Sequence, residues 1–258
     1  MKLYSRSILF ATSVVLMTAF YSCNSDEPKM HVTPEYVRIP NGLTSQIKSY
    51  TGFTLSYNKD NRTPNYVAWE LLRSEVATDM SRSDNFWQDP DIDGCTKHSD
   101  YTRSGYDRGH MCPAADQKWS TKAMNDCFVM ANMCPQLHDL NAGAWQTLED
   151  KERQWAKRDS AVWIVAGPIY SKADTTYFES SKVRVPGAFF KVLVAPYLKE
   201  PRGIAFVYPH MKCPGNMQAY ATTIDEVEKI TGFDFFASLP DDIEKKVEST
   251  FSFTDWNR

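Results

Sequence analysis

The sequence of 258 residues lacks a surplus of positive charge, since 29 Lys and Arg residues stand against 32 Asp and Glu residues. It also lacks any repeat with a period of 20–50 residues, any heptad run and any low-complexity tract, which excludes solenoids, coiled coils and biased linkers. Its hydrophobic content of 42% and aromatic content of 13% are too high for a disordered chain. What remains is a globular protein with enough chain for one large domain or two small ones.

The acidic charge is concentrated near the C-terminus. Residues 225–249 carry eight acidic residues and three lysines, a net charge of −5, whereas residues 30–224 carry 22 cations against 21 acids. Non-specific binding to a polyanion depends on clustered cations, so the total charge of the chain argues against such a partner. The middle of the chain is nearly neutral, so its charge does not argue against a polyanionic partner. Residues 241–248 are expected to form a solvated helix face.

The N-terminus has no apolar run long enough to cross a membrane. Residues 8–20 are largely apolar, but a bilayer core needs roughly 20 residues. The run follows Lys2 and Arg6 and precedes Ser22-Cys23, and it resembles a bacterial lipoprotein signal. We therefore expect a signal peptide over residues 1–22, a lipid on Cys23, a polar tether over 23–45 and one domain over 46–258. Simple secretion is the alternative. The implied location is outside the cytoplasm, on a membrane-anchored lipoprotein of the outer membrane that faces the periplasm or the cell surface.

The cysteines lack the Cys-x-x-Cys spacing of a structural zinc site, in which His98, His110 or His138 would supply nitrogen ligands. Export favours disulfides instead. An odd number of cysteines follows Cys23, so at least one thiol stays free if all pairing is internal. The pairing is open among Cys95, Cys112, Cys127, Cys134 and Cys213.

Strand-like and helix-like segments both occur, which predicts an α+β protein. Residues 50–57 and 66–72 read as a hairpin around a turn at 58–65. Residues 79–105 read as a loop. Strands are expected at 128–133, 162–166, 189–195 and 204–208, and helices at 121–126 (capped by Ser120), 141–158 and 224–230.

The tetrapeptide Asp107-Arg108-Gly109-His110 places a phosphate-matching guanidinium beside a titratable base. Gly109 is expected to let the backbone turn tightly between them. Alone, this pattern is weak evidence, because a single histidine is more often an ordinary surface or core residue.

Asn141, Trp145 and Glu149 are four residues apart, so a helix places them on one face. An amide oxygen and a carboxylate then share a stripe, separated by roughly 12 Å along the axis. They could form a site for a hard cation such as Mg²⁺, which needs few protein ligands. Equally, Asn141 could cap the helix while Glu149 pairs with Arg153.

Three motifs in order carry a family resemblance: Asp107-Arg108-Gly109-His110, then Asn132-x-x-Pro135-Gln136, then Leu140-Asn141-x-x-x-Trp145-x-x-Leu148-Glu149. Together they resemble the DNA/RNA non-specific endonucleases, the ββα-metal (His-Me finger) nucleases that include the Serratia-type nuclease and endonuclease G. The likeness extends over roughly residues 50–245. It implies a central antiparallel sheet flanked by helices.

The resemblance also implies roles for particular residues. His110 matches the general base that activates water, with an imidazole pKa near ~6.5 if it is unperturbed. Asn141 matches the single protein ligand of Mg²⁺ (Mn²⁺ is also possible), and Glu149 matches the residue that orients the metal-bound waters. Asn132 matches an asparagine that arranges the base and the substrate. Arg108 matches an arginine that supports phosphate binding.

A second phosphate-binding arginine is assigned to Arg82, with Arg103 as the alternative. In Met111-Cys112-Pro113, which follows the histidine motif, Cys112 departs from many relatives, and a local disulfide with Cys127 or Cys134 is a further hypothesis. The tryptophans Trp69, Trp145, Trp155 and Trp163 are expected in the core.

The function that the resemblance implies is metal-dependent, sugar-non-specific endonucleolytic hydrolysis of DNA and RNA to 5′-phosphate and 3′-hydroxyl ends. DNA and RNA are then the partners, with a homodimer as a possibility. Two alternatives are a phosphodiesterase for small nucleotides and a surface lipoprotein that binds nucleic acid without cutting it.

Overall fold

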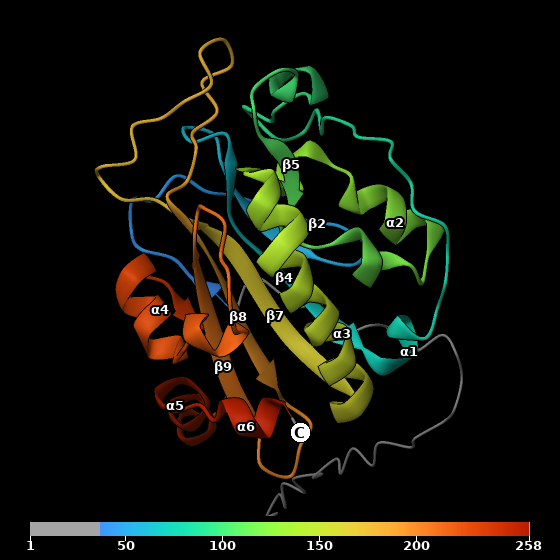
Figure 1. The fold of residues 1–258 in the computed structure, drawn as a ribbon, viewed down its shortest axis with the longest axis vertical. Helices are drawn as coiled ribbons and strands as arrows, with labels where there is room; N and C mark the ends of the chain where they lie inside the picture. Colours follow the sequence, from blue (N-terminus) through green and yellow to red (C-terminus); the bar gives the residue numbers. More distant parts are fainter. Residues whose placement is uncertain (1–36, 258) are drawn as a thin grey trace, which may run out of the picture.

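A seven-stranded antiparallel sheet forms the centre of the protein in the computed structural model, which describes residues 37–257 (Figure 1). Its strands are ordered β10-β9-β8-β7-β4-β3-β2. In sequence order they are β2 (Gln46–Ser49), β3 (Thr54–Asn58), β4 (Thr63–Leu72), β7 (Ala161–Ile169), β8 (Ala188–Ala195), β9 (Arg202–Pro209) and β10 (Ala221–Thr222). The α+β class and the antiparallel sheet are therefore confirmed.

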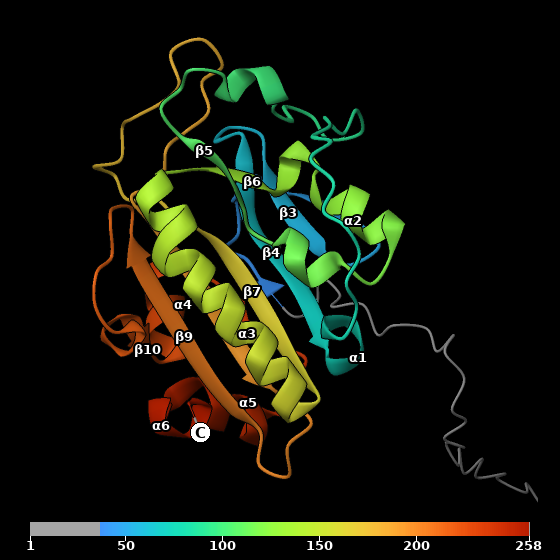
Figure 2. The ribbon, with the colours of Figure 1, turned by 45° about the vertical axis from the view of Figure 1, so that its right-hand side comes forward.

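Alternate residues of the central strands face two separate cores, because side chains alternate across a strand. On one face, residues such as Trp69, Ile164 and Phe206 pack with α3 (Gln146–Asp159). On the other face, Tyr66 and Phe190 belong to a second cluster that α4 (Ile224–Thr231) and α5 (Asp241–Ser249) cover. The two views show α3 across one face and α4 and α5 on the other side of the sheet (Figure 2). The sheet thus separates two surfaces of the molecule. All four tryptophans expected in the core are buried.

A smaller ββα unit lies beside the N-terminal end of α3. Strand β5 (Asp107–His110) pairs antiparallel with β6 (Met133–Gln136), and the chain then enters a π-helical turn, Leu140–Trp145, that continues into α3 (Figure 2). The remaining short elements are β1 (Val37–Arg38), α1 (Arg73–Val76), α2 (Thr121–Cys127), β11 (Asp234–Phe235), α6 (Phe253–Trp256) and 3-10 turns at His98–Tyr101, Ala114–Gln117, Met130–Asn132 and Met217–Tyr220.

Several sequence expectations for local structure are confirmed. Strands β3 and β4 form the hairpin, with a shorter turn than expected. The Ser120 side chain accepts hydrogen bonds from the backbone N–H groups of Lys122 and Ala123 at the start of α2. Helix α4 ends at Gly232, which adopts a left-handed φ of 73° that glycine tolerates without strain.

Two expected strands differ from the structure. Residues 128–133 are not a strand: Met130–Asn132 forms a 3-10 turn, and β6 begins only at Met133, where β5 supplies a partner. Strand β7 does not end before Gly167-Pro168 but continues to Ile169. Proline is tolerated there because β4 pairs with β7 only as far as Ala166, so its missing N–H removes no bond to β4.

The expected tether is partly folded. Val37–Arg38 pairs with Asp234–Phe235, and Val37 is buried, so the folded part begins before residue 46. The signal peptide, Cys23 and His31 lie outside the described residues. The segment expected as a solvated helix face is α5, but it buries Val247 and Glu248. Between residues 37 and 257, no helix combines the length and apolar character that spanning a bilayer requires.

The expected disulfides are absent from the described part of the chain. All five of its cysteines are free thiols, and all five are buried. Cys112 accepts a hydrogen bond from Gln117 Nε2 at 3.2 Å instead of joining Cys127 or Cys134. The local disulfide proposed for Cys112 is therefore wrong, and these cysteines serve as packed core residues.

Candidate active site

A polar cavity of about 230 Å³ opens where β5, the π-helical turn and α3 meet. The ββα unit brings residues 107–149 together there, and Arg82 reaches it from the preceding loop. The lining residues that can do chemistry are Arg82, Arg108, His110, Asn141, Glu149 and Arg153.

Gly109 is required by close packing rather than by a turn. It lies within β5, opposite Cys134 of β6. A Cβ at this position would lie 2.2 Å from Oε1 of Gln136, a buried side chain. The glycine therefore lets β6 approach β5, which fixes the direction in which His110 leaves the strand.

His110 is held in an apolar environment next to arginines. Its residue is 8% exposed, and its ring packs against Phe128 and Phe86 at centroid distances of 5.0 and 5.8 Å. Burial, with repulsion from Arg82 and a smaller term from Arg108, lowers the pKa of His110 to about 3. This pKa lies well below the ~6.5 of an unperturbed imidazole. The imidazole is neutral at physiological pH, and its buried Nε2 has no hydrogen-bond partner among the described residues. A bound phosphate anion would offset the arginine charges and raise the pKa of the base.

Asn132 does not line the cavity; it holds the backbone that follows His110. The side chain is fully buried. Its Oδ1 accepts from Cys112 N at 2.9 Å, and its Nδ2 donates to the carbonyls of Cys112 and Cys127, each at 2.9 Å. The Asn132 carbonyl also accepts from Met111 N at 3.0 Å. These bonds agree with the expected role in arranging the base, and the side chain is not part of the cavity lining.

Asn141 faces the cavity and does not cap the helix. The turn that contains it begins after Asp139, and Asn141 Nδ2 donates to Asp107 Oδ2 at 2.9 Å. The same carboxylate oxygen lies 2.8 Å from His138 Nδ1. Because Asp107 holds the amide nitrogen, the amide oxygen is the atom left to ligate a hard cation.

Glu149 borders the cavity with a side chain that is 13% exposed. Burial raises its pKa to about 8; Lys191 opposes the shift, and Glu152 and Asp116 add to it. Lys191 is fully buried, with Nζ 2.9 Å from Glu152 Oε2 and 3.8 Å from Glu149 Oε1. Its ammonium also lies 4.6 Å from the centroid of the Trp145 ring.

Arg153 does not form the expected pair with Glu149. Its Nη1 donates to Asp116 Oδ1 at 2.9 Å, and it also pairs with Asp150. Asp116 is buried and accepts a second bond, from Trp69 Nε1 at 3.0 Å. Behind the cavity, Asp116 and Glu152 each pair with a base, Arg153 and Lys191 respectively, and Glu149 lies farther from Lys191. A divalent cation beside Asn141 and Glu149 would favour the charged form of Glu149.

The structure places Arg82 and Arg103, the two candidates for the second phosphate-binding arginine, in different surroundings. Arg82 lines the cavity, bonds Asp84 at 3.0 Å and places its guanidinium 5.1 Å from the Phe128 ring centroid. Arg108 lies 4.6 Å from the Phe86 ring, and its buried Nε has no partner among the described residues. Arg103 is exposed and is not among the lining residues. Of Arg82 and Arg103, only Arg82 lies at the cavity.

Sequence reasoning missed Arg153, Glu152 and Lys191. Arg153 extends the four-residue spacing of Asn141 and Glu149 by one turn, so the signal for it was present. Lys191 is the one charged residue within the apolar strand β8, which marks a buried charge.

His210, directly after β9, connects two other segments of the chain. Its Nε2 accepts from Leu137 N at 2.8 Å, and its Nδ1 lies 2.7 Å from the Pro186 carbonyl. These two bonds fasten the chain just after β6 to the region beyond β7.

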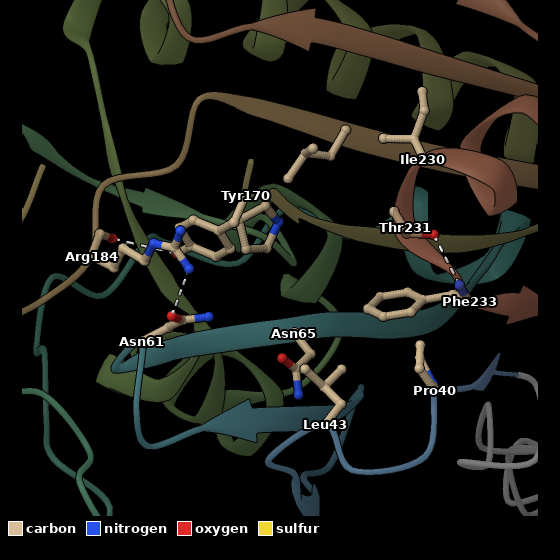
Figure 3. Close-up of a pocket in the computed structure, with 11 residues that line it drawn as sticks. Pro40, Leu43, Asn61, Asn65, Tyr170, Arg184, Ile230, Thr231 and Phe233 are labelled. Atoms are coloured by element: carbon tan, nitrogen blue, oxygen red, sulfur yellow. Dashed lines mark hydrogen bonds between the residues drawn. The ribbon is translucent and has the colours of Figure 1, made fainter. Parts of the chain in front are cut away.

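A second cavity, of about 200 Å³, lies between the N-terminal residues Pro40 and Leu43, the end of β7, and α4 (Figure 3). Its walls include Ile230 and Phe233, and its charged residue is Arg184. The Arg184 guanidinium already bonds Asn61 and stacks on Tyr170. This cavity contains no carboxylate and no histidine, so it lacks the groups for phosphodiester hydrolysis.

Comparison with known proteins agrees with the geometry. The family model for DNA/RNA non-specific endonuclease matches residues 34–242. A nuclease of Nostoc is 34% identical over 212 residues, which cover 76% of this chain and 75% of that protein. Human mitochondrial nuclease EXOG is 31% identical over 213 residues, 76% of this chain but 58% of the human protein.

A chain of the solved EndoG/EndoGI complex superposes with a TM-score of 0.73 at 27% identity, covering 80% of this chain and 91% of that one. The ββα-metal nuclease fold is thereby confirmed. With the family model spanning most of the described residues and the motif residues lining one cavity, the chain belongs to the DNA/RNA non-specific endonucleases.

Proposed function

We propose that the protein is a Mg²⁺-dependent endonuclease that hydrolyses both DNA and RNA through a water activated by His110. One observation carries the proposal: a neutral imidazole, an amide oxygen, a carboxylate and three arginines line a single cavity. Mn²⁺ could replace Mg²⁺, since both ions prefer oxygen ligands.

Each residue has a task that its position allows. His110 accepts a proton from the attacking water at Nε2, the nitrogen that has no other hydrogen-bond partner among the described residues. Arg82 and Arg108 bind the non-bridging phosphate oxygens and stabilise the charge that grows there. Asn141 Oδ1 would hold the ion directly, and Glu149 would hold its waters. When bound, the ion supplies Lewis-acid stabilisation of the phosphoryl group and of the leaving oxygen.

The products follow from which bond is broken. Loss of the 3′-oxygen as leaving group gives a 5′-phosphate and a 3′-hydroxyl. The cavity presents charged groups that match a phosphodiester backbone, which DNA and RNA share. This supports DNA and RNA as substrates of the same site.

The test is digestion of plasmid DNA and of RNA by the wild type, His110→Ala and Asn141→Ala, with and without EDTA. Both variants are expected to lose activity by at least about a hundredfold, His110→Ala through loss of the general base and Asn141→Ala through loss of the metal ligand. Arg103→Ala is the control for Arg82→Ala, because only the second arginine lines the cavity. Full activity of His110→Ala would refute the role of the base.

The same assay distinguishes the alternatives. A phosphodiesterase for small nucleotides would cleave small diesters faster than polymers. A binding lipoprotein would retain nucleic acid in EDTA and would never nick plasmid.

We further propose export and anchoring at the outer membrane through Cys23. Replacement of Cys23 by serine should release the protein from the membrane fraction, and an unchanged distribution would oppose the anchor. A homodimer is a separate proposal, which light scattering of the purified protein tests.

A further inference from the structure

Five carboxylates from the acidic C-terminal part converge on the face of the sheet opposite α3. They come from α4, β11 and α5, which lie together away from the ββα unit (Figure 1). They form two triads, each with carboxylate oxygens within 4.8 Å of one another: Asp225, Glu228 and Glu248, and Asp234, Glu244 and Glu248. Glu248 belongs to both triads and is therefore the centre of the cluster.

Glu248 is buried although it has no bonding partner for one of its oxygens. The residue is 8% exposed, and its buried Oε1 has no hydrogen-bond partner among the described residues. A buried polar atom without a partner costs free energy, and native proteins rarely keep one without a reason. Burial first, and then repulsion from Glu228 and Glu244, raises the pKa of Glu248 to about 9.

Nearby cations do not neutralise this centre. Arg38 bonds Asp234 at 3.2 Å, but its side chain is 69% exposed. Lys229 pairs with Glu226 and Lys246 with Glu200, and both of these acids lie outside the two triads. These ion pairs leave Glu248 itself without a basic partner among the described residues.

We propose that this cluster is a second divalent-cation site, of a size and ligand type that suit Ca²⁺. Ca²⁺ takes about six to eight oxygens at roughly 2.3–2.6 Å, so ligands on opposite sides lie about 4.6–5.2 Å apart. The oxygens of each triad lie within 4.8 Å of one another and can therefore share one ion. A set made entirely of carboxylates suits Ca²⁺, whereas Mg²⁺ usually keeps several waters and takes only one or two carboxylates. An ion at the first triad would join α4 to α5, and one at the second would join α5 to β11 and, through β11, to the paired strand β1.

Thermal unfolding tests the site, compared in EDTA and in 10 mM CaCl₂. A site with a Kd of about 1 mM should raise the wild-type Tm by roughly 3–6 °C. Glu248→Gln keeps the size of the side chain and should abolish most of the rise. Asp242 lies on the exposed side of the same helix, so Asp242→Asn should retain the rise in Tm. Calorimetry should show one bound Ca²⁺ fewer in Glu248→Gln than in Asp242→Asn.

Two further variants separate this site from the active site. Asn141→Ala should keep the Ca²⁺-dependent rise, and Glu248→Gln should keep its nuclease activity in Mg²⁺. If Glu248→Gln folds poorly, Asp225→Asn takes its place, because Asp225 is a less buried member of the cluster. Asp225→Asn is expected to weaken the Ca²⁺-dependent rise in Tm. The proposal is overturned if the wild-type Tm does not respond to Ca²⁺, or if Glu248→Gln responds as strongly as the wild type.

Discussion

The buried pair of Lys191 and Glu152 should be the most sensitive part of the polar network behind the cavity. Both side chains are fully buried, and their charged atoms are 2.9 Å apart. Glu152 Oε1 already lacks a partner among the described residues, so Lys191→Met would leave both carboxylate oxygens without one. Breaking one half of a buried ion pair costs about 3–5 kcal/mol. For a chain of this size, that loss lowers the Tm by roughly 6–20 °C.

The double variant Lys191→Met/Glu152→Gln separates charge from packing. It removes the unpaired charge but keeps similar side-chain volumes, and such replacements are often close to neutral. We expect the double variant to recover at least about 2 kcal/mol of the free energy of unfolding lost in Lys191→Met. Urea unfolding of the wild type, both single variants and the double variant provides the cycle.

The reasoning is refuted if Lys191→Met loses less than about 1 kcal/mol, which is the range of an exposed ion pair. It is also refuted if the two single losses simply add in the double variant, since the partners would then not interact. Ser181→Ala would not serve as a control, because the Ser181 side chain is itself buried. Lys199→Met, on an exposed lysine just beyond β8, provides the control for the change of residue type.

Three further outcomes are expected. Gly109→Ala should destabilise the ββα unit by about 1–3 kcal/mol through overpacking against Gln136. In urea unfolding, Gly109→Ala/Gln136→Ala should recover part of that loss. An equal loss of unfolding free energy in the single and the double variant would contradict the close contact. Asn132→Ala should lower the free energy of unfolding by about 3 kcal/mol, because it removes three buried hydrogen bonds. It should lower kcat much more than it changes KM, because the residue holds the base and does not reach the cavity. An effect on KM alone would oppose this reasoning. Folded His110 stays neutral down to about pH 3, whereas the unfolded imidazole protonates near pH ~6.5. The contribution of His110 to the free energy of unfolding is therefore full above about pH 6.5 and falls by about 1.4 kcal/mol per pH unit between about pH 6.5 and pH 3. His110→Gln should lose this part of the slope when the free energy of unfolding is measured against pH.

The sequence was informative where short motifs act locally. Residues 107–149 contain the base, the amide and the carboxylate, and the strand pair and helix that hold them are continuous with those motifs. The four-residue spacing placed Asn141 and Glu149 on one side of a helix, and both line the cavity. The kink at Gly143 within the π-helical turn had no comparable signal.

Partners from distant elements could not be predicted from local pattern. Glu149 was expected to pair with Arg153 one turn away, but Lys191 of β8 and Asp116 compete for these charges from elsewhere in the fold. Residues 128–133 have the apolar character of a strand, yet only Met133 and its successors find a neighbouring strand. The low pKa of His110 likewise depends on burial and on Arg82, which approaches from a different loop.

The pairing of β1 with β11 determines from which side the chain enters the domain. Val37 packs in the core of the α4 face, whereas His110 packs in the core of the α3 face. The described chain therefore enters the fold on the side of the sheet away from the cavity. A long polymer can reach the cavity without crossing β1.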